Sequence, residues 1–118
     1  MPGVPDQADV AIFDIAQLRD VCMDDEELMR ELVQGMIEDT TARIPILEDA
    51  IARSDAKQCA REAHYVKGAC ANVGATSMAA VLKSIELQAS AGDFDACRTS
   101  LDALAAELQK FSSQAAVL

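Results

Sequence analysis

The chain contains one histidine, His64, and the residues around it could do chemistry. A lysine follows three positions later, at Lys67, and a glycine follows four positions later, at Gly68. Because residues at i, i+3 and i+4 share one face of an α-helix, a helix through this segment would bring the three together. They would offer a nucleophilic ring nitrogen, a positive charge, and a position without a side chain that could block an approaching partner. That combination suits the acceptance of a phosphoryl group from another protein.

The composition favours a helical protein of one domain. The chain has 118 residues, enough for a single continuous core. Hydrophobic residues make up 51% of it but aromatic residues only 3%, so the core must be built from aliphatic side chains, methionine and alanine, which favours helices over sheets. Five glycines and three prolines are too few for the many turns of an all-β fold.

The charge of the chain limits its partners. A formal net charge of −10 at pH 7 would repel nucleic acid and an anionic membrane surface, so we expect neither as a partner. The sequence has no apolar run of about 18 residues, and its start is not a basic segment followed by an apolar one, so neither a transmembrane segment nor a secretory signal is predicted. We expect a cytoplasmic monomer.

The four cysteines do not predict a metal site. They stand at positions 22, 59, 70 and 97 without a C-x-x-C pair, and a zinc site would need paired thiols or nearby histidines. Three of the four fall on the apolar faces of predicted helices, which is typical of buried, reduced thiols. A di-iron helical bundle would need Glu-x-x-His repeats, which one histidine cannot supply. We therefore expect no metal and no cofactor.

Helix boundaries follow from aspartates before apolar segments and glycines after them. Helices are predicted to begin at Asp14, Asp24, Ser54-Asp55 and Asp93 and to end at Gly74 and Gly92. Pro45, inside the second helix, predicts a kink or a break near Thr41, because proline removes a helical hydrogen bond and clashes with the preceding turn. Short connections at the two glycines would fold consecutive helices back on one another. The predicted fold is all-α: an antiparallel up-down four-helix bundle over residues 13–118 with a short additional N-terminal helix, after a flexible lead-in over residues 1–12.

The third predicted helix should direct His64 away from the core. Its apolar residues repeat at alternating steps of four and three, which places them on one side of a helix. They are Cys59, Ala63, Val66, Cys70 and Val73. At 100° per residue, His64 projects about 140° from that direction. The outer side also carries Ala60, Arg61, Gly68 and Ala71. Lys67 and Arg61 would stabilise negative charge placed on the ring, and the spacing alone leaves open an ordinary solvated helix face.

The stretch Ala63–Ala75, AHYVKGACANVGA, followed by Leu82, Ile85 and Glu86, resembles the signature of histidine-containing phosphotransfer (HPt) domains. That family carries Ala-His-x-Leu-Lys-Gly, then a Gly-Ala pair, then an apolar-Glu pair on the next helix. The resemblance extends over roughly residues 14–112. Val66 stands where leucine is usual, and Cys70 where a small polar residue is common. Neither departure concerns the histidine.

The resemblance implies a phosphoryl carrier rather than an enzyme. HPt domains accept a phosphoryl group from the phospho-aspartate of a receiver domain, in a response regulator or a hybrid histidine kinase, and pass it to another receiver. On this chain His64 would carry the group, and Lys67 and Arg61 would stabilise the phosphoryl oxygens. Glu86, on the next helix, is a candidate for orienting the ring or Lys67.

The resemblance also implies a docking surface for the receiver around the histidine. Gly68 would permit close approach, and Ala60 and Ala71 are further candidates for this surface, together with part of the short N-terminal helix. Leu28 and Leu32, on the second helix, either join this surface or pack beneath the short helix. The sequence leaves both arrangements open.

Two other functions share parts of this pattern. The first alternative is an HPt-like module that binds a kinase or receiver without accepting phosphate, but such modules usually lose the histidine or the lysine, and both are present here. The second is the dimerisation and phosphotransfer part of a histidine kinase, a two-helix hairpin followed by an ATP-binding domain. The chain has five predicted helices and no glycine-rich nucleotide loop. Catalysis by the chain itself would need a nucleophile–base pair, and a second histidine is absent.

Overall fold

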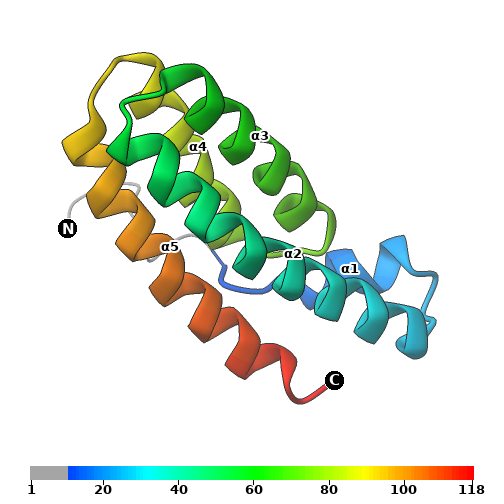
Figure 1. Ribbon diagram of the computed structural model, residues 1–118. Helices are drawn as coiled ribbons and strands as arrows, with labels where there is room; N and C mark the ends of the chain where they lie inside the picture. The colour runs from blue at the N-terminus through cyan, green and yellow to red at the C-terminus, as the bar shows by residue number, and fades with distance from the viewer. Residues whose placement is uncertain (1–10) are drawn as a thin grey trace, which may run out of the picture.

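The computed structural model describes residues 11–118, and these residues form five α-helices and no strand (Figure 1). The helices are α1 (Ile15–Val21), α2 (Glu26–Ala52), α3 (Ala56–Asn72), α4 (Thr76–Ser90) and α5 (Phe94–Ala115). The prediction of an all-α fold is therefore confirmed. The predicted lead-in, residues 1–12, lies almost wholly outside the described residues and stays a prediction.

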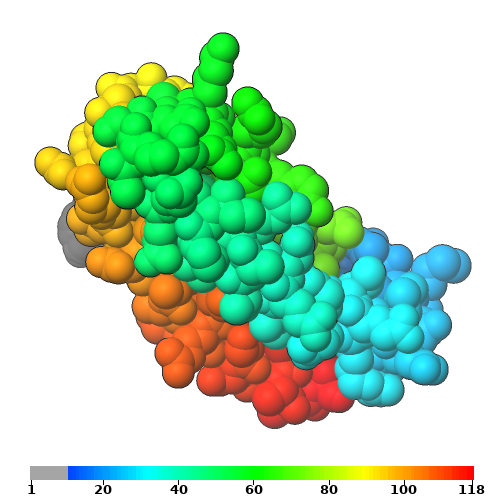
Figure 2. Space-filling view, in the orientation of Figure 1, coloured from blue at the N-terminus to red at the C-terminus, as the bar shows by residue number. Residues whose placement is uncertain are grey.

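The four long helices pack around a shared core. Helix α2 contacts α3 and α5, α4 also contacts α3 and α5, and the short α1 lies against α2 (Figure 1). At 1.5 Å per residue, the 27 residues of α2 extend about 40 Å, close to the 42 Å longest dimension of the molecule. In Figure 2, α2 and α5 cross the visible face side by side, and the last residues of the chain lie beside the start of α2.

Aspartates begin four of the five helices. The side chains of Asp14, Asp25, Asp55 and Asp93 each accept a hydrogen bond from the backbone N–H three residues later, at 3.1 Å. These bonds satisfy a donor that the first helical turn leaves unpaired. The predicted start of α2 at Asp24 is wrong by one residue. Asp24 has a left-handed φ of 64°, which belongs to the turn before the helix, and the next aspartate provides the cap.

Helix α2 runs without interruption through Pro45, so of the predicted kink or break near Thr41 the break is wrong. Pro45 itself is exposed, while Thr40 and Leu47 on either side of it are buried in the core. Proline removes one backbone hydrogen bond from the helix, but the burial of the turns on both sides outweighs that local loss. The continuous α2 packs against α3 and α5.

The apolar spacing predicted for α3 is confirmed. Its five residues at alternating steps of four and three are all buried, with exposures of 3% or less. All four cysteines are buried and unpaired, as expected. Burial raises the pKa of the Cys59 thiol to about 12 and that of Cys70 to about 12. Both thiols are therefore protonated at neutral pH and are poor nucleophiles.

The turn between α3 and α4 depends on a glycine. Gly74 has φ of 80°, a left-handed conformation that L side chains rarely adopt. Its carbonyl accepts a hydrogen bond from the backbone N–H of Asp14 at 2.7 Å, which ties the start of α1 to this turn. A Cβ at position 74 would overlap the carbonyl oxygen of Asp14. Gly92, between α4 and α5, has φ of 76° but has open space around it.

These two turns allow a matched test. Gly92→Ala should lower the free energy of unfolding by about 1–2 kcal/mol, the usual cost of a left-handed alanine. Gly74→Ala should cost a further 1–3 kcal/mol or so, because the added methyl also displaces the start of α1. Urea denaturation followed by helical circular dichroism measures both. Equal losses in the two variants would show that the contact with Asp14 contributes nothing.

Candidate functional site

His64 lies near the middle of α3 and points away from the core. Its side chain is 68% exposed, whereas the preceding residue, Ala63, is fully buried. This is the orientation that the helical period predicts. The nucleophilic ring is thus held on a rigid helix at the surface, within reach of a partner.

Glu86, on α4, contacts both the imidazole of His64 and the ammonium of Lys67. Its Oε2 lies 3.1 Å from Nδ1 of His64, and its Oε1 accepts a hydrogen bond from Nζ of Lys67 at 2.8 Å. The arrangement follows from the packing of α4 on α3, because Ile85 is buried between the helices and Glu86 emerges at their edge. The structure therefore brings together His64, Lys67 and Glu86, three residues singled out in the sequence.

The electrostatics of this cluster determine which ring nitrogen is available. The hydrogen bond from Lys67 lowers the pKa of Glu86, with a smaller effect from His64. Glu86 is consequently ionised at neutral pH and can only accept hydrogen bonds. The Nδ1 atom of His64 must then carry the proton that is shared with Glu86. In the uncharged ring this leaves Nε2 with a free lone pair.

The remaining predicted site residues lie on α3 on either side of His64, and none of them takes part in an ion pair among the described residues. Gly68 and Ala71 are exposed and Ala60 is half-buried, and the position of a Cβ on Gly68 would be open space. Arg61 is exposed and forms no ion pair with any residue of the range 11–118. Small side chains therefore flank the ring along α3, together with the basic residues Arg61 and Lys67.

Helix α1 borders this face. The side-chain amide of Gln17 donates to the carbonyl of Ala71 at 2.7 Å. Of the two leucines that the sequence left unassigned, Leu28 is 38% exposed, and Leu32 is partly buried against the core. Leu32 also lines a hollow of about 320 Å³ between α2 and α3. The hollow includes Ala69 and Asn72, which flank the outer face of α3.

A second cluster, which the sequence did not reveal, lies on the opposite side of His64. The Arg43 guanidinium stands 4.4 Å from the ring centroid of Tyr65, and its Nη1 donates to Oε1 of Glu62 at 2.7 Å. The hydrogen bond to Glu62 raises the pKa of Arg43 and is the largest cause of that shift. Tyr65, next to the histidine in sequence, is 53% exposed. Because the partners come from two helices, no spacing within one helix could have predicted the contact.

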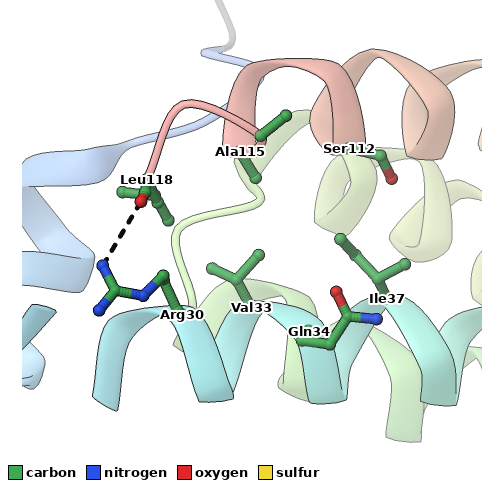
Figure 3. Close-up of a pocket in the computed structure, with 8 residues that line it drawn as sticks. Arg30, Val33, Gln34, Ile37, Ser112, Ala115 and Leu118 are labelled. Atoms are coloured by element: carbon green, nitrogen blue, oxygen red, sulfur yellow. Dashed lines mark hydrogen bonds between the residues drawn. The ribbon is translucent and has the colours of Figure 1, made fainter. Parts of the chain in front are cut away.

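The hollow drawn in Figure 3 does not belong to this site. It has a volume of about 410 Å³ and lies between the start of α2 and the end of the chain, where Arg30 Nη1 donates to the carbonyl of Leu118 at 3.4 Å. Its remaining lining residues are Val33, Gln34, Ile37, Ser112, Ala115 and Ala116. None of its lining residues is a histidine or a cysteine, and the hydroxyl of Ser112 donates a hydrogen bond to the carbonyl of Leu108 at 2.9 Å.

Neither a membrane span nor a metal centre is found within residues 11–118. No helix there is both long and apolar enough to cross a membrane. The same residues contain no group of three or more His, Cys, Asp or Glu side chains placed to hold a metal ion.

Comparisons with known proteins bear on the family and the fold of the chain. The family model described as Hpt domain matches residues 31–114, which include α3, α4 and the histidine. The chain belongs to the Hpt domain family. Its fold is similar to that of histidine-containing phosphotransfer protein B (HptB) from Pseudomonas aeruginosa PAO1, with a TM-score of 0.79, 22% sequence identity, and coverage of 91% of this chain and 96% of that one. No curated protein matches the chain.

Glu86 bridges His64 and Lys67 through its two carboxylate oxygens, and titration can test this bridge. Lys67→Met removes the hydrogen bond that lowers the pKa of Glu86, so the carboxyl should titrate at a higher pH than in the wild type. In the wild type this group contributes stability that is complete above its ordinary value of 4.5 and is lost as the pH falls through the lowered pKa of the folded state. Carbon-13 NMR of the Glu86 carboxyl measures the change. Lys110→Met serves as the control and should leave Glu86 unaffected, and an unchanged Glu86 titration in Lys67→Met would contradict the bridge.

Proposed function

We propose that this protein carries a phosphoryl group on His64 within a two-component phosphorelay. It would accept the group from the phospho-aspartate of one receiver domain and pass it to the aspartate of another. The observation that carries the proposal is the exposed imidazole whose Nδ1 is held by Glu86 at 3.1 Å. Membership in the Hpt domain family supports it. No catalytic base of this chain is required.

The transfer step follows from the state of the ring. The Nε2 lone pair attacks phosphorus, a P–N bond forms, and the acyl P–O bond breaks with its electron pair moving to the receiver's aspartate. Since Nδ1 keeps its proton, the ring gains one positive charge. The Glu86 carboxylate beside Nδ1 offsets that charge. The second transfer reverses these steps with a new aspartate as the nucleophile.

The basic residues next to the ring would stabilise the transferred group. Lys67 lies on α3 less than one turn after His64, and its ammonium is already held at the same edge by Glu86. Arg61 lies one turn before the histidine and is exposed. Both can approach phosphoryl oxygens on Nε2, where a positive charge lowers the energy of the developing anion. The receiver would supply the divalent metal and the acidic pocket.

The receiver would dock on the small residues around the histidine. Gly68, Ala60 and Ala71 leave the ring accessible, and the hollow between α2 and α3 adjoins them. Leu28 and Ile15 are each 38% exposed and extend the apolar surface towards α1. A partner that meets this face can bring its aspartate close to Nε2 without displacing a large side chain.

We also propose that α2–α5 form the antiparallel up-down four-helix bundle that the sequence predicts. The ring of contacts from α2 through α3, α4 and α5 back to α2 supports it, as do the short turns at Gly74 and Gly92. The colour sequence along these helices in Figure 1 runs in alternating directions. In this bundle α3 and α4 present one edge to a partner, and the opposite helices support it.

His64→Gln tests the proposed function directly. Wild-type protein should acquire a label that is acid-labile and base-stable, either from a labelled phospho-receiver or from the small donor phosphoramidate. The variant should acquire none, because an amide cannot replace the nucleophilic ring nitrogen. Circular dichroism verifies that the variant is folded. A folded variant that still takes up label would exclude His64 as the acceptor, whereas an unlabelled wild type would favour a binding module without phosphotransfer.

Gly68→Gln separates docking from stability. Gly68 is a helical glycine with open space around it, so glutamine should raise the free energy of unfolding by about 0.5 kcal/mol through its better helix propensity. Transfer from a receiver should nevertheless fall about tenfold or more, because the longer side chain obstructs close approach. Ala105→Gln, at an exposed position on α5, is the control. Undiminished transfer to Gly68→Gln would place the docking surface elsewhere.

A further inference from the structure

The charge of this protein is distributed unevenly between its helices. Together α3 and α4 contain four basic residues and two acidic ones, whereas the rest of the chain contains six basic and eighteen acidic residues. The helix pair that carries His64 is therefore net positive within a chain of net charge −10. Helix propensity does not require this difference, since lysine, arginine and glutamate are similarly good helix formers.

The two acidic residues of this pair are already engaged. Glu62 accepts a hydrogen bond from Arg43 at 2.7 Å, and Glu86 accepts one from Lys67 at 2.8 Å. Three other basic side chains of the pair are exposed: Lys57, Arg61 and Lys83. None of them takes part in an ion pair with another residue of the described part of the chain. The face thus presents positive charge that no neighbouring carboxylate neutralises.

These exposed cations lie on the same side as the histidine. Lys57 and Arg61 precede His64 by seven and three residues, so all three share the outer face of α3. Lys57 lies about 10 Å from His64 along the helix axis at 1.5 Å per residue. It is therefore too remote to contact a phosphoryl group on the ring. Lys83 precedes Glu86 by three residues and shares its face of α4.

We infer that Lys57, Arg61 and Lys83 form a basic docking rim that recognises acidic side chains on the receiver, beside its phospho-aspartate pocket. This inference rests on the proposed function and adds how the partner is selected. A protein partner is favoured over a polyanion such as nucleic acid, because the remaining surface is strongly acidic and would repel a long anionic chain. The rim attracts a partner with local negative charge, and the acidic remainder rejects one that is negative throughout.

The test compares two lysines of different helices. Lys57→Glu reverses a charge on the basic docking rim, and Lys110→Glu makes the same change on α5, where the lysine pairs with Glu107 at 3.2 Å. The probe is a phospho-receiver that labels wild-type His64. At low salt, the second-order rate constant for transfer to Lys57→Glu should fall about fivefold, and that for Lys110→Glu by less than about twofold. At about 0.5 M salt the rates should converge, because screening then acts within a few ångströms.

The possible outcomes distinguish this inference from the proposed function. Equal losses in the two variants, or a loss in Lys57→Glu that persists unchanged at high salt, would overturn the basic docking rim. Thermal melts followed by circular dichroism exclude unfolding as the cause of a loss. Labelling of the wild type by phosphoramidate needs no docking and tests the acceptor alone. If His64 took no label from phosphoramidate or from any receiver, the proposed function itself would be overturned.

Discussion

The packing of α3 against α4 is the constraint on which the site depends. The buried residues of α3 repeat at steps of four and three, so one side of the helix faces the core and His64 must face outward. The same contact fixes the rotation of α4, which brings Glu86 to Nδ1 of the ring and to Lys67. A change that rotated either helix by a fraction of a turn would separate these groups even if each residue were retained.

Burial also determines which nucleophiles can react. The chain has four thiols and one imidazole, yet all four thiols are inside the core and burial keeps Cys59 and Cys70 protonated at neutral pH. The imidazole instead lies on the surface. The distribution of side chains between core and surface therefore leaves the imidazole accessible and the thiols inaccessible, although thiolates are intrinsically stronger nucleophiles.

The sequence was sufficient for features governed by one helix and insufficient for features governed by two. The outward direction of His64 and the aspartate caps depend on local spacing; the direction is confirmed, as are the caps at Asp14, Asp55 and Asp93, whereas the cap of α2 lies one residue after the predicted Asp24. Continuity of α2 through Pro45 depends on burial of the neighbouring turns, which a local rule for proline does not contain, so the break that it allowed did not occur. The contact of Arg43 with Tyr65 and Glu62 depends on how α2 and α3 are placed, and no periodicity contains that information. Glu86 could be named as a candidate, but its contact with both partners required the rotation of α4.

In the proposed transfer, the placement of Glu86 would allow a carrier to work without a catalytic base. Attack by Nε2 would place positive charge on the ring while Nδ1 keeps its proton, so no proton would have to leave before the P–N bond forms. The carboxylate that offsets this charge is present before and after transfer, and it acts equally in the reverse step. A base that removed the proton would instead make the phosphorylated ring a poorer leaving group. Retention of the proton thus leaves the bond labile, as passage of the group to a second receiver demands.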